Sequence, residues 1–91
     1  MAYELYTVPK CGGCEEVKNI LNEKEIPYET YNLRDPEHKK VFGKVYTQID
    51  GDLKRNVTDN KTILPILVEV DESRTVKRFG QRPTDISDMF N

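Results

Sequence analysis

The sequence has few cysteines and no strong excess of either charge. Two of its 91 residues are cysteine, too few for a secreted domain held together by several disulfides. With 14 basic and 16 acidic residues the formal net charge is −2, so no broad basic surface suggests a nucleic-acid partner. Charged residues make up 33% of the chain and hydrophobic residues 36%. This balance and length predict one water-soluble domain that spans residues 1–91.

Long apolar segments are also missing. The longest run, Ile63 to Val68, is interrupted by Pro65 and is far shorter than the roughly 20 residues that a membrane-spanning helix needs. No basic segment precedes an apolar stretch at the N-terminus, so we expect no cleaved secretory signal. The protein is therefore expected in the cytoplasm, without a membrane partner.

The spacing of the apolar residues predicts an α/β fold. Residues 3–8 and 28–33 are rich in β-branched and aromatic side chains, which is typical of strands. Between them, from Gly12 onward, apolar side chains recur at helical spacing. A strand, a helix and a strand within about thirty residues form a βαβ unit, whose strands must be parallel.

The second half of the chain predicts a helix, two strands and a short closing helix. Asp35 and Pro36 are suited to the N-cap and the first position of a helix that ends near Ile49. The segments that follow are predicted as a polar surface loop, a buried strand, a last strand and a helix, at residues 50–62, 63–70, 75–79 and 83–90. The predicted order of elements is β-α-β-α-β-β-α.

The two cysteines lie three residues apart, where the first strand gives way to the first helix. Cys11 precedes the helix and Cys14 lies in its first turn, so both sulfurs face the same side. A disulfide can close over Gly12 and Gly13, which offer little steric resistance. The first amide groups of the helix have no partner within it and point toward Cys11. These amides, together with Lys10, would stabilise a thiolate, and the pKa of thiols in such settings falls from about 8.5 to about 3.5–7.5.

These features predict a redox pair. Cys11 would attack a disulfide, and the more deeply buried Cys14 would resolve the mixed disulfide. Two other interpretations stay open. The pair could be part of a zinc site with His38, although structural zinc sites take four ligands, or both cysteines could be inert core residues. We favour the redox pair and expect no metal ligands.

Pro65 lies near the start of a predicted buried strand, where it cannot donate to the hydrogen-bond ladder. One interpretation is an edge strand or a bulge. The other is a cis proline that leaves the backbone of Leu64 free to pair with an extended substrate peptide. The upstream cysteine pair favours the second interpretation.

Three stretches, LYTVPKCGGC at residues 5–14, ILPILV at 63–68 and FGQRPTDI at 79–86, follow one another along the chain. Together they resemble the glutaredoxins and glutaredoxin-like redoxins of the thioredoxin superfamily. The resemblance implies a thioredoxin-like fold, with a four-stranded mixed sheet flanked by three helices and a cis Pro65 beside the cysteines. The residues that we expect to contact substrate are Tyr6, Lys10, Gly12, Gly13, Leu64, Pro65, Gly80 and Gln81.

The resemblance also implies a function. A monomeric thiol–disulfide oxidoreductase with no tightly bound cofactor would reduce protein disulfides or glutathione mixed disulfides, with glutathione as a candidate co-substrate. One basic side chain among Lys54, Arg55 and Lys61 would then bind a glutathione carboxylate. The stretch at residues 80–83 is similar to that of redoxins that supply electrons to ribonucleotide reductase and are recharged by thioredoxin reductase. Either glutathione or thioredoxin reductase is therefore the expected electron donor.

A second hypothesis comes from a different class of function. No proline follows Cys11, and some glutaredoxins with a flexible insert between their cysteines hold an iron–sulfur cluster. In that case Cys11 from two chains, together with two glutathione molecules, would bind the cluster, and the protein would act as a carrier.

Overall fold

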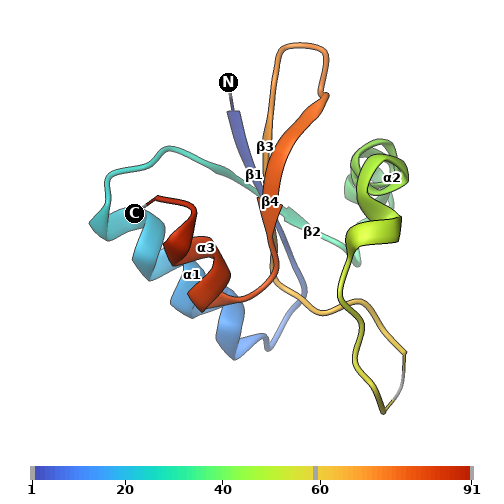
Figure 1. Cartoon of the computed structure of the whole chain (residues 1–91), viewed down its shortest axis with the longest axis horizontal. Coiled ribbons are helices and arrows are strands. Elements are labelled where there is room, and N and C mark those ends of the chain that lie inside the picture. The colour runs from blue at the N-terminus through green and yellow to red at the C-terminus, as the bar shows by residue number, and fades with distance from the viewer. Residues whose placement is uncertain (1, 59, 91) are drawn as a thin grey trace.

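The computed structural model describes residues 2–58 and 60–90, which form one four-stranded sheet with helices on both faces (Figure 1). In chain order the elements are β1 (Ala2–Thr7), α1 (Gly12–Glu23), β2 (Glu29–Asn32), α2 (Pro36–Ile49), the 3-10 helix η1 (Asp50–Asp52), β3 (Ile66–Val70), β4 (Val76–Gly80) and α3 (Pro83–Asp88). Apart from the one-turn η1, this is the order that the sequence predicts.

The strands lie in the order β2-β1-β3-β4. β1 pairs with β2 in parallel and with β3 in antiparallel orientation, and β3 and β4 are antiparallel. The sheet is therefore mixed, as expected. The parallel pair requires a crossover connection, which α1 supplies. Because β1 is an interior strand, the residues that follow Thr7 lie at the middle of one end of the sheet.

The sheet separates two apolar cores. Leu5 belongs to the core on the face covered by α1 and α3, whereas Tyr6 belongs to the core on the face covered by α2. Successive residues of a strand point to opposite faces, which explains why these neighbours separate. Figure 1 shows α1 and α3 together on one face and α2 on the other.

α1 forms because its apolar side chains repeat at helical spacing. Cys14, Val17 and Leu21 are all buried along one stripe of the helix, as the sequence predicts. The helix ends at Glu23, and Glu25 has a φ of 56°, a left-handed conformation that turns the chain back toward β2.

The structure corrects the start of β3. The strand was predicted from Ile63, but it begins at Ile66, and Tyr6 opposite Ile66 is the last pair in its ladder with β1. Pro65 has no amide hydrogen to donate, so the preceding segment cannot continue the ladder. The bond between Leu64 and Pro65 is cis, and β3 lies inside the sheet, which rejects the edge-strand interpretation.

The predicted loop at residues 50–62, of which residue 59 lies outside the described residues, contains more secondary structure than expected. It opens with η1, and an isolated bridge between Arg55 and Thr62 brings its two sides together. The helices of the described residues are all too short or too polar to cross a membrane.

Candidate active site

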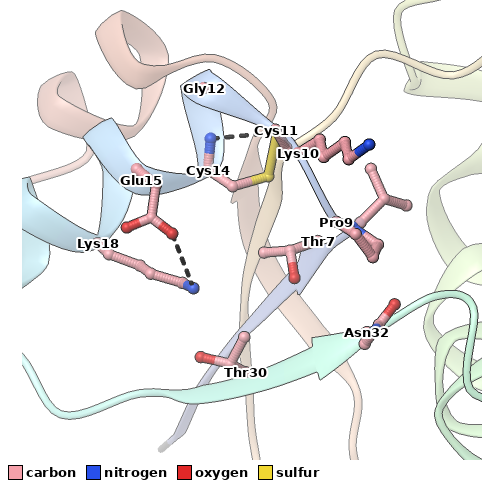
Figure 2. A pocket seen from close by; sticks show the side chains of 11 residues that line it. Thr7, Pro9, Lys10, Cys11, Gly12, Cys14, Glu15, Lys18, Thr30 and Asn32 are labelled. Carbon is pink, nitrogen blue, oxygen red and sulfur yellow. Dashed lines mark hydrogen bonds and ion pairs between the residues drawn. A yellow bond between two sulfur atoms is a disulfide. The ribbon is translucent and has the colours of Figure 1, made fainter.

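The two cysteines form a disulfide at the end of β1, with Cα atoms 5.2 Å apart. Cys11 is the N-cap residue of α1, and its Sγ accepts a hydrogen bond from the amide of Cys14 at 3.2 Å (Figure 2). Cys14 is 3% exposed, whereas Cys11 is half-buried. The expected difference in burial and the expected amide donor are therefore both confirmed.

Lys10 shapes the turn that leads into the site. Its φ is 60°, in the left-handed region that non-glycine residues seldom adopt. This conformation turns the chain from β1 so that Cys11 can cap α1. The Lys10 side chain is exposed and borders a pocket beside the disulfide, and its contact with substrate stays a prediction.

Gly12 and Gly13 have different surroundings although they are neighbours. A Cβ atom at Gly12 would meet nothing within 4 Å, whereas one at Gly13 would lie 3.3 Å from Cδ of Pro65 and 4.0 Å from Cγ of Pro83. Gly13 is therefore the point where α1, the segment before β3 and the start of α3 meet. The buried cis proline lies beside the cysteine motif, as expected.

Leu64 is half-buried immediately before Pro65. Among the described residues, no backbone hydrogen-bond partner is found for its amide or carbonyl. The preceding residue is held firmly, since the Ile63 amide donates to the Lys54 carbonyl at 3.1 Å and its carbonyl accepts from Gln81 Nε2 at 3.1 Å.

Gln81 was predicted to contact substrate, but its side chain is buried and binds the protein backbone instead. The side chain is 3% exposed. Its Oε1 accepts from the Lys54 amide at 2.6 Å, and its Nε2 donates to the carbonyls of Lys54 and Ile63 at 3.0 and 3.1 Å. All these bonds are to protein backbone. Gln81 therefore fixes the loop that leads to Leu64 and Pro65.

The predicted substrate contact at Gly80 is also corrected. A Cβ atom there would lie 3.0 Å from Sδ of Met89 and 3.1 Å from Cγ1 of Ile86. Gly80 is buried, and its lack of a side chain allows β4 to pack closely against the end of α3.

Tyr6 does not border the site, contrary to the prediction. Its side chain is completely buried, and its hydroxyl donates to Glu4 Oε1 at 2.7 Å. The ring stacks on Tyr31 at a centroid distance of 5.2 Å and packs against Phe42. Burial, and then the hydrogen bond to Glu4, raise the pKa of Tyr6 well above its usual value. Tyr6 points toward α2 because strand residues alternate, while its neighbour Thr7 points to the face of α1 and lines the pocket.

A partly buried ion pair joins β1 to the turn between β3 and β4. Glu4 is 3% exposed, and its Oε2 accepts from Nε and Nη2 of Arg74 at 3.1 and 2.8 Å. This pair was not predicted from the sequence. The available indication was a glutamate inside an apolar strand, because a buried carboxylate requires a partner, but its partner is 70 residues away.

His38 is not part of a cysteine site. Its Nδ1 accepts from the Asn32 amide at 2.8 Å, and its ring packs edge-on against Tyr31. Within residues 2–58 and 60–90, no group of three or more His, Cys, Asp or Glu residues is placed to hold a metal ion.

The basic loop residues that were considered for glutathione binding have partners in the protein. Lys54 Nζ lies 3.7 Å from Asp85 Oδ2, and Arg55 donates to the hydroxyls of Tyr46 and Thr62 at 2.6 and 3.3 Å. Their contact with a glutathione carboxylate stays a prediction.

A pocket of about 540 Å³ opens beside the disulfide, on the side of β2 (Figure 2). We call it the β2-side pocket. Its lining residues come from the end of β1, the first turns of α1 and from β2, and they are Thr7, Val8, Pro9, Lys10, Cys11, Gly12, Cys14, Glu15, Lys18, Thr30 and Asn32.

The comparisons with known proteins agree with this geometry. The family model described as Glutaredoxin matches residues 3–50, more than half of the chain. The structure is similar to that of NrdH-redoxin from Escherichia coli, which is described as a glutaredoxin-like protein with a thioredoxin-like activity profile. The TM-score is 0.58 at 18% sequence identity, over 98% of this chain and 95% of that chain, which shows a shared fold. A search of curated proteins finds no match to the sequence. Through its family match, its thioredoxin-like fold and its cysteine pair, the chain belongs to the glutaredoxin family.

Proposed function

We propose that this protein reduces protein disulfides or glutathione mixed disulfides, with Cys11 as nucleophile and Cys14 as resolving thiol. One observation carries the proposal. The Sγ of Cys11 caps α1 and accepts the Cys14 amide at 3.2 Å, while Cys14 lies buried behind it. In the reduced protein, this amide and the helix dipole would stabilise a Cys11 thiolate.

The reaction takes two exchange steps. The Cys11 thiolate attacks one sulfur of the substrate disulfide, whose S–S bond breaks as one substrate thiolate leaves. The Cys14 thiolate then attacks Cys11 Sγ in the mixed disulfide, and the second substrate thiolate leaves. The disulfide between Cys11 and Cys14 results, as seen in the structure. Two electrons pass from the protein to the substrate, and solvent supplies the protons that convert the two leaving thiolates to thiols.

Leu64 would hold the substrate chain during these steps. Its amide and carbonyl have no partner among the described residues, and Pro65 packs beside Gly13 at the disulfide. An extended peptide can pair with such a backbone as an added strand. Gln81 supports this arrangement through the hydrogen bonds that fix Lys54 and Ile63.

To return to the dithiol form, the oxidised cysteine pair must accept two electrons from a reductant. Glutathione and thioredoxin reductase are the two candidates. The thioredoxin-like activity profile of the structurally similar NrdH-redoxin and the sequence GQRP at residues 80–83 favour thioredoxin reductase. The resemblance of residues 80–83 to redoxins that supply electrons to ribonucleotide reductase supports that enzyme as a substrate.

Cysteine variants test the mechanism directly. Cys11→Ser should abolish reduction of insulin disulfides. Cys14→Ser should instead accumulate a mixed disulfide between Cys11 and the substrate, which mass spectrometry detects as a covalent adduct. Each variant is the control for the other, because the chain has two cysteines. Turnover by Cys11→Ser, or an adduct on Cys14 rather than on Cys11, would refute the assignment of roles.

The electron donor is tested separately with the unmodified protein. The oxidised protein is supplied with NADPH and either thioredoxin reductase, or glutathione with glutathione reductase. We expect faster NADPH consumption with thioredoxin reductase. Faster consumption with glutathione would contradict this part of the proposal and leave the roles of the two cysteines intact.

A further inference from the structure

The disulfide has two flanks, which the sheet places on either side of β1. On one flank, β3 begins just after Leu64 and Pro65, and on the other flank β2 ends at Asn32. Neighbouring strands lie about 4.8 Å apart, so the two flanks are separated by about 10 Å. An extended peptide covers this distance with about three residues. A substrate chain held at Leu64 and joined to Cys11 would therefore extend into the β2-side pocket.

Polar and charged side chains from β1, α1 and β2 contribute to the lining of this pocket. Lys10 and Lys18 are its two basic residues, and Thr7 and Thr30 carry hydroxyls, of which that of Thr7 donates to the Tyr31 carbonyl at 3.4 Å. Figure 2 shows the Lys18 side chain reaching from α1 into the space above Thr30, with Lys10 on the other side of the disulfide. Glu15 supplies the one carboxylate of the lining. Two ammonium groups against one carboxylate leave the pocket with a net positive charge.

The Glu15 carboxylate competes only weakly with an incoming anion for the Lys18 ammonium group. It lies 3.5 Å from Lys18 Nζ, and its side chain is 73% exposed, whereas that of Lys18 is 31% exposed. Ion pairs on an exposed helix surface contribute little because water and salt screen them. Lys10 has no carboxylate partner among the described residues. Both ammonium groups are therefore available to a carboxylate that enters the pocket.

We propose that the β2-side pocket binds an aspartate or glutamate side chain located within about two residues of the reactive cysteine in protein substrates. This inference rests on the proposed function, because it describes where the substrate chain runs once its sulfur is bonded to Cys11. A carboxylate there lies between Lys18 and Lys10 and within reach of the hydroxyl of Thr30. Protein disulfides in acidic surroundings are then preferred over those in basic surroundings.

Matched peptide substrates test the subsite. Three cysteine peptides, identical except for aspartate, asparagine or lysine on both sides of the cysteine, are offered as disulfide-linked homodimers, so that attack by Cys11 always bonds it to one peptide and releases the other. The values of kcat and KM are measured for each. We expect the aspartate peptide to have about 3–5-fold higher kcat/KM than the asparagine peptide, the upper part of the range for an exposed ion pair. The lysine peptide should have the lowest value. The difference should lie in KM and should shrink as salt is raised toward about 1 M, where the Debye length falls to about 3 Å.

Two variants connect the preference to the pocket. Lys18→Met should reduce the difference between the aspartate and asparagine peptides to less than about 2-fold, since one of the two ammonium groups is lost. Lys24→Met removes the same charge from an exposed position just after α1, at the end away from the disulfide, and should keep the full preference.

The outcomes separate the inference from the function on which it rests. If the three peptides are reduced with equal kcat/KM, or if Lys18→Met keeps the full preference, the acidic subsite is refuted and the oxidoreductase proposal stands. If none of the peptides is reduced, the proposed function itself is refuted.

Discussion

Gly12→Ala and Gly13→Ala add the same methyl group to neighbouring positions in the first turn of α1, in different surroundings. At Gly12 the new Cβ would have open space, whereas at Gly13 it would lie 3.3 Å from Cδ of Pro65. Carbon atoms pack best at about 3.5–4.0 Å. Pro65 is buried, and its ring has no flexible end that could move aside. The two variants therefore isolate the contact between the cysteine motif and the cis proline.

The magnitudes follow from two opposing terms. Replacing glycine by alanine in a compatible helical conformation stabilises a protein by about 0.4–1 kcal/mol, because the unfolded chain loses freedom. Gly12→Ala should show this gain in full. Overpacking a buried contact costs about 1–3 kcal/mol, so Gly13→Ala should be no more stable than the wild type and up to about 2.6 kcal/mol less stable.

Urea titrations of the oxidised proteins measure both free energies of unfolding, and thermal melts check them. For a domain of this size about 1 kcal/mol corresponds to a shift of about 4–8 °C in Tm. Gly12→Ala should therefore melt a few degrees above the wild type and Gly13→Ala at or below it. Equal stabilisation by both substitutions would refute the close packing of Pro65 on Gly13.

Three further predictions concern the polar groups that hold the fold. Gln81→Ala removes three hydrogen bonds from a buried side chain and should lower the free energy of unfolding by about 1–3 kcal/mol in a urea titration. As its control, Gln48→Ala removes three hydrogen bonds from an exposed glutamine and should lower the free energy of unfolding by less than about 0.5 kcal/mol. Arg74→Met leaves the Glu4 carboxylate buried without its cation and should cost about 2–4 kcal/mol, part of which Glu4→Gln should restore in the double variant. Burial, and then a hydrogen bond to a neighbouring glutamate, raise the pKa of Tyr31 from 10.0 to about 12. The folded state therefore favours the neutral phenol of Tyr31. This contribution to the free energy of unfolding is complete below pH 10 and is lost as the pH rises toward 12. Tyr31→Phe should lose less stability than the wild type when denaturation is measured across that pH range.

Residues that act through their sequence neighbours could be predicted from the chain alone. The burial of Cys14, Val17 and Leu21 follows from their helical spacing. The position of Cys11 as N-cap follows from the strand that ends before it and the apolar stripe that begins after it. Asp35 caps α2 as expected, since its side chain accepts from the amide of Glu37 at 2.9 Å.

The corrected residues share a dependence on distant partners. Tyr6 and Leu5 are both buried, because the interior strand β1 is covered on both faces. Alternation separates the two side chains but does not say which face carries the site. The partner of Gln81 is 27 residues away and that of Glu4 is 70 residues away. No local pattern of apolar and polar residues encodes such pairs.

The sequence by itself determined the order of the elements and the position of Cys11 and Cys14 at the start of the first helix, because both depend on spacing within a few residues of the chain. Tertiary structure decided what surrounds that disulfide. Pro65 reaches Gly13, and Lys18 faces Thr30 across the β2-side pocket, because the parallel pairing of β1 with β2 and the antiparallel pairing of β1 with β3 bring three separate segments to one end of the sheet. Strand pairing joins segments that are distant in sequence, so the side chains that it brings together are close in space but not along the chain.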